Sequence, residues 1–115
     1  MNLDLTPDQR LFRQEVAAFA LAHVEPASAR IDETGEFPWA LVKLAGTHGL
    51  AGMTIPESWG GGGRDYVSYA LAIETVARSS ATLATILIVN NSLVGEVLVR
   101  FGSDAQKALW QRPRR

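Results

Sequence analysis

The segment from residue 80 to residue 101 constrains the fold of this chain more than any other part of the sequence. Its apolar character continues through Leu98 to a stop at Gly102, a length that indicates a helix. On a helical wheel its apolar side chains lie on every side rather than along one stripe: Leu83, Ile86, Leu87, Ile88, Val89, Val94, Val97, Leu98 and Val99. A helix that is apolar all round is normally buried all round. Because a few short helices cannot cover both of its flanks, we predict that polypeptide outside these 115 residues covers part of it.

Two other structures are considered for this segment. A strand over residues 85–89 would suit a short β-branched run, but the apolar pattern is too long for one strand. A membrane span needs about 20 nearly uninterrupted apolar residues. Polar side chains interrupt the segment near its middle, namely Asn90, Asn91, Ser92 and Glu96. We therefore expect a buried helix and no membrane span.

The rest of the chain predicts further helices and one long loop. A capping box at Thr6 and Gln9 starts a helix over about residues 6–24, which Pro26 ends or kinks. Further helical segments follow: a short stretch over residues 27–33, a helix from Pro38 to Gly49, one over 66–79 capped by Asp65, and one from Ser103. Residues 49–65 have no helical period and contain six of the ten glycines. A loop of this length usually serves a site or borders a surface.

Composition limits the function classes. A chain of 115 residues with 47% hydrophobic content forms one folded domain. Its net charge of −1 provides no basic field for a nucleic acid. The absence of cysteine removes disulfides, thiolate nucleophiles and cysteine-type zinc sites, and the N-terminus does not resemble a signal peptide. We expect a cytoplasmic protein.

Few residues suggest chemistry by pattern alone. The glycines at 60–63 could approach a phosphate, but no Lys-Ser/Thr follows them and the G-x-G-x-x-G spacing is missing. His23 and His48 belong to different helices and match no metal-binding spacing, so we interpret them as solvated or packed side chains and predict no metal site. No carboxylate is marked as a general base, so we predict no catalytic residue. Pattern alone therefore indicates a helical domain with an unmatched apolar face.

A resemblance to a known family extends this interpretation. Leu5-Thr6-Pro7-Asp8-Gln9 is followed in order by the segment 49–61 (GLAGMTIPESWGG), Asp65-Tyr66 with 73–78 (IETVAR), Asn91-Ser92-Leu93, and 101–107 (FGSDAQK). This ordered set resembles the amino-terminal helical domain of the acyl-CoA dehydrogenases over about residues 3–110. The resemblance implies an all-α fold, an up-and-down or orthogonal bundle of about five helices with one long glycine-rich loop.

The resemblance also implies a function. Enzymes of this family bind FAD and an acyl-CoA and introduce an α,β double bond. A glutamate removes the α-proton, the flavin accepts hydride, and the electrons pass to an electron-transferring flavoprotein. The amino-terminal domain supplies one wall of the acyl and flavin cavity, whereas a β-rich middle domain and a carboxy-terminal helical domain supply most FAD contacts and the base. By position, five residues match those that line the acyl end of the pocket: Thr85, Ile86, Val89, Asn90 and Leu93.

The carboxyl end departs from the family pattern. Gln-Arg-Pro-Arg-Arg stands at 111–115 where the family continues with a Leu-Pro and a link to the middle domain. We therefore divide the chain into a helical domain, 1–110, and an atypical basic tail, 111–115, at a point of truncation. We expect the chain alone to bind no FAD and to be inactive, with acyl-CoA and the missing domains or another subunit as its partners in the family. A non-catalytic interaction or oligomerisation module, a non-functional remnant and a small acyl- or CoA-binding protein are the alternatives.

Overall fold

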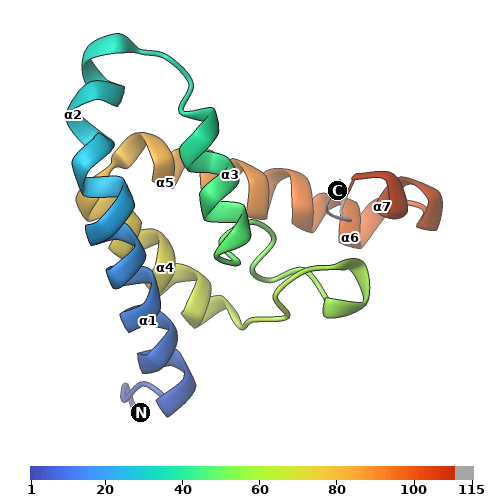
Figure 1. Cartoon of the computed structure of the whole chain (residues 1–115). Coiled ribbons are helices and arrows are strands. Elements are labelled where there is room, and N and C mark those ends of the chain that lie inside the picture. The colour runs from blue at the N-terminus through green and yellow to red at the C-terminus, as the bar shows by residue number, and fades with distance from the viewer. Residues whose placement is uncertain (111–115) are drawn as a thin grey trace.

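The structure, a computed structural model, describes residues 1–110, and the regular elements in that range are helical (Figure 1). The predicted basic tail, 111–115, lies outside the described residues. The elements join into five continuous helices: α1 (Pro7–Phe19), the π-helical η1 (Ala20–Val24) and α2 (Glu25–Thr34); α3 (Trp39–Thr47); α4 (Tyr66–Ser79); α5 (Ala81–Ile88), the π-helical η3 (Val89–Glu96) and α6 (Val97–Phe101); and α7 (Asp104–Trp110). The all-α fold class is confirmed.

The first helix begins as predicted but does not end where expected. The Gln9 N–H donates to Thr6 Oγ1 at 3.2 Å and the Thr6 N–H donates to Gln9 Oε1 at 2.9 Å, which completes the capping box. Of the two outcomes expected at Pro26, an end or a kink, the helix does not end there, because α1, η1 and α2 run on to Thr34. In η1 the backbone widens to π-type turns, and the Glu25 N–H donates to the Ala20 carbonyl five residues back. This wider turn ends two residues before Pro26, which has no backbone N–H to donate.

The core lies where α1, α4 and α5 meet. Helix α4 packs along α1, and α5 turns back against α4 (Figure 1). Ser80 makes this reversal sharp, because it ends α4 and its hydroxyl accepts the Leu83 N–H at 3.2 Å to begin α5. Helix α3 and the loop after it add further side chains to the same cluster, which includes Phe12, Val16, Phe19, Val24, Leu41, Ala45, Leu50, Met53, Ala72, Val76, Leu83 and Leu87.

The domain is flat rather than round. Its principal extents are 40 × 40 × 22 Å, because the helix from Ala81 to Phe101 continues well past the α1–α4 pair (Figure 1). Helix α7 follows at the far end of that helix and contacts α6. The overall shape therefore leaves much of the longest apolar segment outside the core.

The long loop predicted over residues 49–65 is present and closes on itself. It contains one short 3₁₀ turn, η2 (Glu57–Trp59). The N–H groups of Gly62, Gly63 and Arg64 donate to the carbonyls of Gly52, Ile55 and Met53 at 3.0, 2.9 and 2.8 Å. A Cβ on Gly61 would lie 2.2 Å from the Ile55 carbonyl oxygen, so this position has room for glycine alone. The glycine run serves close backbone packing, and its N–H groups are bound within the loop.

Candidate functional site

The helix from Ala81 to Phe101 buries one row of residues and little else. Leu83, Leu87, Asn91 and Gly95, four residues apart, are buried, as is Ala84 near its start. Large apolar side chains elsewhere on the helix are exposed, with Leu93 at 64% and Phe101 at 82%. Within the described residues this is the one helix long and apolar enough to span a membrane, yet only 28% of its apolar 18-residue window is buried. The prediction that its own neighbours cannot cover it is confirmed.

The polar residues that interrupt this helix bind the long loop. Asn91 is completely buried. Its Oδ1 accepts the Met53 N–H at 2.5 Å, and its Nδ2 donates to the carbonyls of Leu50 at 3.0 Å and Leu87 at 2.8 Å. The neighbouring Asn90 Oδ1 accepts the Gly52 N–H at 3.2 Å. The sequence predicted that these asparagines interrupt a membrane span and match family positions, but it did not predict that they hold the loop.

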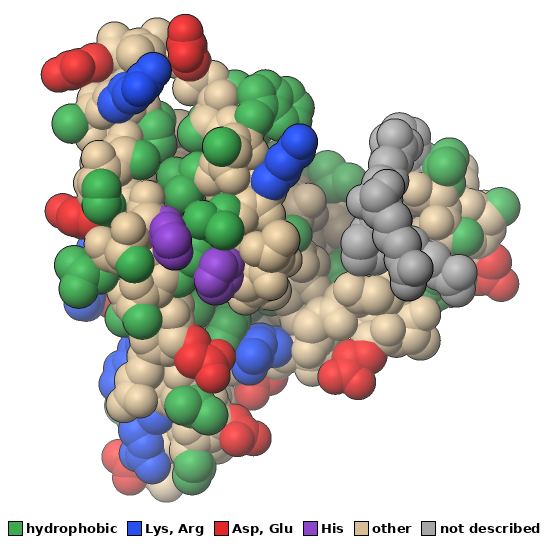
Figure 2. Space-filling view, in the orientation of Figure 1, with side chains coloured by type: hydrophobic (Ala, Val, Ile, Leu, Met, Phe, Trp, Pro, Cys, Tyr) green, Lys and Arg blue, Asp and Glu red, His purple; other side chains and the backbone are tan. Residues whose placement is uncertain are grey.

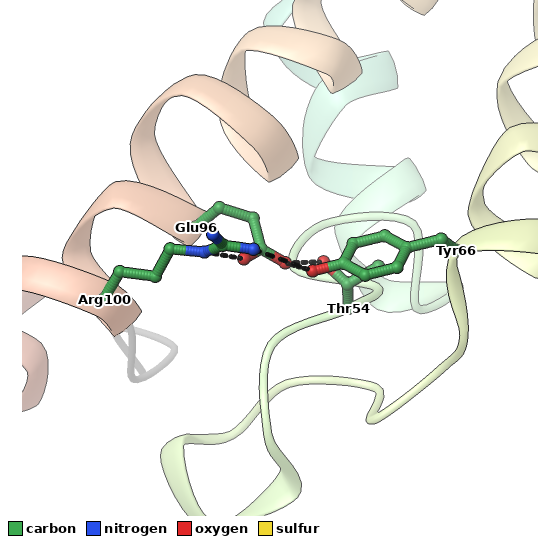
Figure 3. A network of polar contacts seen from close by, with 4 residues as sticks. All are labelled: Thr54, Tyr66, Glu96 and Arg100. Carbon is green, nitrogen blue, oxygen red and sulfur yellow. Dashed lines mark hydrogen bonds and ion pairs between the residues drawn. The ribbon is translucent and has the colours of Figure 1, made fainter.

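Glu96 makes a second connection between the helix and the loop (Figure 3). Its Oε1 accepts hydrogen bonds from Thr54 Oγ1 at 2.8 Å and from the Tyr66 hydroxyl at 3.2 Å. Arg100 lies one turn further on, with its Nε 3.5 Å from Glu96 Oε2. The Tyr66 hydroxyl, with Glu96 second, raises the pKa of Arg100. The carboxylate thus joins the helix, the loop and the first residue of α4.

Close packing reinforces these polar contacts. A Cβ on Gly95 would lie 2.9 Å from Ile55 Cδ1, so the glycine lets this buried loop residue approach the helix. Ile55, Met53 and Leu50 are all almost fully buried. The loop therefore covers one side of the helix and leaves the opposite side open.

The five residues matched to the acyl end of the family pocket lie within two to three turns of one another on this helix. Thr85, Val89, Asn90 and Leu93 are exposed, and Ile86 is half-buried. We call Ile86, Val89 and Leu93 the apolar strip. Thr85 Oγ1 donates to the Ala81 carbonyl at 2.9 Å, and Asn90 binds the loop. The strip can bury alkyl groups but carries no group that transfers a proton, and its contact with an acyl chain stays a prediction.

The described residues do not fit FAD as a holding site. A dinucleotide requires donors for its pyrophosphate and polar partners for its ring. The Thr85 hydroxyl and the Asn90 carbonyl oxygen already have partners, and the N–H groups of Gly61, Gly62 and Gly63 bind carbonyls of their own loop. These groups therefore supply no cradle for a dinucleotide.

The structure also brings together two residues that the sequence left unrelated. The ring centroids of His23 and His48 lie 5.8 Å apart, and both rings contact Phe19. No spacing rule signals this pair, because the residues are on η1 and at the end of α3.

Comparison with known proteins places these features in a family. Residues 6–113 match the model of the acyl-CoA dehydrogenase N-terminal domain. The chain is 40% identical to an acyl-CoA dehydrogenase of Bacillus subtilis and 38% identical to the human mitochondrial short-chain specific acyl-CoA dehydrogenase, over 91% and 97% of its length. It spans only 28% and 27% of those two proteins.

Solved structures give the same result. Butyryl-CoA dehydrogenase from Megasphaera elsdenii aligns with a TM-score of 0.87 and 29% identity, over 96% of this chain and 30% of that one. A chain in a structure described as the electron transferring flavoprotein of Acidaminococcus fermentans aligns with a TM-score of 0.93 and 30% identity, over 98% of this chain and 30% of that one. The chain belongs to the acyl-CoA dehydrogenase family, in which it corresponds to the N-terminal helical domain.

Proposed function

We propose that this domain forms one wall of the acyl cavity in an FAD-dependent acyl-CoA dehydrogenase and that it does not catalyse dehydrogenation by itself. The observation that carries the proposal is the open apolar strip of Ile86, Val89 and Leu93 on a helix whose other side is covered by its own loop. The relatives named as acyl-CoA and butyryl-CoA dehydrogenases support acyl-CoA as the substrate class.

The strip acts through burial rather than through chemistry. Each methylene that an acyl chain buries contributes about 0.8 kcal/mol. The exposed side chains of Val89 and Leu93 gain from the same contact, since both now face solvent. Closing this face also excludes water from the reacting part of a substrate. The base and the flavin contacts belong to segments outside this chain.

The loop gives the strip a defined position. Three residues on the helix, Asn90, Asn91 and Glu96, bind the loop over Gly52, Met53 and Thr54. These contacts fix the rotation of the helix, so the strip faces away from the loop. Side chains held by packing and by hydrogen bonds of this kind keep a binding surface in place.

A chimeric enzyme tests the proposal. This chain replaces the matching N-terminal segment of the Bacillus subtilis acyl-CoA dehydrogenase, and the purified protein is assayed for FAD content and for kcat/KM on acyl-CoAs of increasing length. We expect the chimera to bind FAD and turn over. Leu93→Phe should shift the optimum to shorter chains, with a loss of about fourfold in kcat/KM for each methylene excluded.

Controls separate the two parts of the proposal. Leu21→Phe changes an exposed side chain on η1, far along the chain from the strip, and should leave the length preference unchanged. An unchanged length profile in Leu93→Phe would show that the strip does not line the cavity. Turnover of acyl-CoA by the 115-residue chain alone, supplied with FAD and an electron acceptor, would refute the non-catalytic role. A chimera that folds and binds FAD but has no activity would favour an interaction module.

A further inference from the structure

The two histidines of this chain form a pair on one surface of the domain. Figure 2 shows both imidazoles side by side between the helix that contains η1 and helix α3. Both side chains are exposed, and the buried ring of Phe19 lies against them, with centroid distances of 5.5 Å to His23 and 4.8 Å to His48. They border a hollow of about 450 Å³ that Glu15 and Leu50 also line.

One imidazole already makes the hydrogen bond that metal-binding histidines make through their second ring nitrogen. His48 Nδ1 lies 2.9 Å from the Leu44 carbonyl oxygen. A carbonyl only accepts, so Nδ1 carries the proton and Nε2 keeps its lone pair when the ring is neutral. Histidine ligands characteristically donate their second ring N–H to a carbonyl or carboxylate in this way. The Leu44 carbonyl thus fixes both the tautomer and the direction of the ring.

The distance between the rings suits a shared ion. In a tetrahedral site each zinc–nitrogen bond is about 2.0–2.1 Å, which puts the centroids of two imidazole ligands about 5 Å apart. The observed 5.8 Å differs from this by less than one ångström, and the exposed His23 ring can adjust its torsion angles. Glu15 adds negative charge to the same hollow.

We propose that His23 and His48 together bind one divalent zinc-class ion, with water completing its coordination. The described residues contain no cluster of three or more histidine, cysteine or acidic ligands, so the protein provides two imidazoles and the remaining positions stay open to solvent. The ion joins η1 to the end of α3 through two residues 25 positions apart in the chain, and thereby stabilises the packing of these segments.

The test is a calorimetric titration of the untagged 115-residue chain with Zn²⁺ in a buffer that does not chelate it. The chain contains two histidines and no cysteine, so competing sites of these types are absent. We expect one ion per chain. His23→Gln and His48→Gln should each weaken binding by about tenfold or more, and the double variant should show no saturable binding, because it has lost both imidazole ligands.

The remaining measurements make the result decisive. Asp32→Asn, on α2 and outside the hollow, should bind Zn²⁺ like the unmodified chain, and circular dichroism checks that each variant is folded. Added Zn²⁺ should raise the urea midpoint of the unmodified chain but not that of His23→Gln, since an ion that binds the folded state stabilises it. Absence of saturable binding, unchanged affinity in either single variant, or one ion per two chains would overturn the proposal.

Discussion

Replacing the buried Asn91 by leucine should destabilise the domain strongly although both side chains branch at Cγ. Asn91 is completely buried and makes three hydrogen bonds, to the Met53 N–H and to the carbonyls of Leu50 and Leu87. In Asn91→Leu the N–H of Met53 and the carbonyl of Leu50 lose a partner, and both residues are 1% exposed or less. A buried polar group without a partner costs about 1–3 kcal/mol.

The expected loss follows from these two groups. Together they cost about 2–6 kcal/mol, and the transfer of an apolar side chain into the core offsets part of this, which leaves about 2–4 kcal/mol. The total stability of a domain is about 5–15 kcal/mol. With a urea m-value of about 1–3 kcal/mol per molar, the midpoint should fall by about 1 M or more.

Urea unfolding followed by tryptophan fluorescence measures this loss. The matched control is Asn90→Ala, which removes the single 3.2 Å bond of an exposed neighbour and should cost about 1 kcal/mol or less. A midpoint for Asn91→Leu equal to that of the unmodified chain would refute the reasoning. So would a control that loses as much as Asn91→Leu, because burial would then not decide the cost.

Two further predictions use the same chain. Gly61→Ala should lower the free energy of unfolding by about 2 kcal/mol or more, because its Cβ would lie 2.2 Å from the Ile55 carbonyl oxygen. In the control Gly46→Ala the nearest atom to the new Cβ is 4.0 Å away, so this variant should stabilise α3 by about 0.5–1 kcal/mol. Equal urea midpoints for the two variants would contradict this prediction. The hydrogen bond from the Ser68 N–H is the main cause of the lowered pKa of Asp65. The Asp65 cap therefore stabilises the folded state at pH values above the ordinary carboxyl pKa of 3.8, and this stabilisation is lost as the pH falls through the lower pKa of the folded state. Asp65→Ala should therefore cost about 1 kcal/mol at pH 7, and thermal unfolding should show this difference shrink at pH 3; a constant difference would argue against the cap.

Local patterns predicted the elements whose causes lie within a few residues. The capping box at Thr6 and the cap at Asp65 involve partners three residues away, and the side chains bond as the sequence indicated. The long loop was also predictable, because a run of glycines has no helical preference. The continuation of the first helix through Pro26 was not, since it depends on the π-type turn that precedes the proline.

The candidate site was predictable only in part. Resemblance to the family picked out the helix and the five positions on it, and the apolar pattern showed that its surface would stay uncovered. The contacts that orient this helix were missed, because Asn90, Asn91 and Glu96 bind partners 38 to 42 residues away in the loop. The histidine pair was missed for the same reason, since its members are 25 positions apart.

Features that the sequence determines by itself therefore depend on residues close together in the chain, whereas features that only the tertiary structure decides depend on residues far apart in it. Helix periodicity, caps and glycine-rich turns act between residues at most a few positions apart, so the amino-acid order alone settles the all-α class and the unmatched apolar helix. The packing of the helices decides which side of that helix faces the loop. It also decides that the two histidines meet over Phe19. Packing brings distant residues together through burial of the whole core, which no short pattern records.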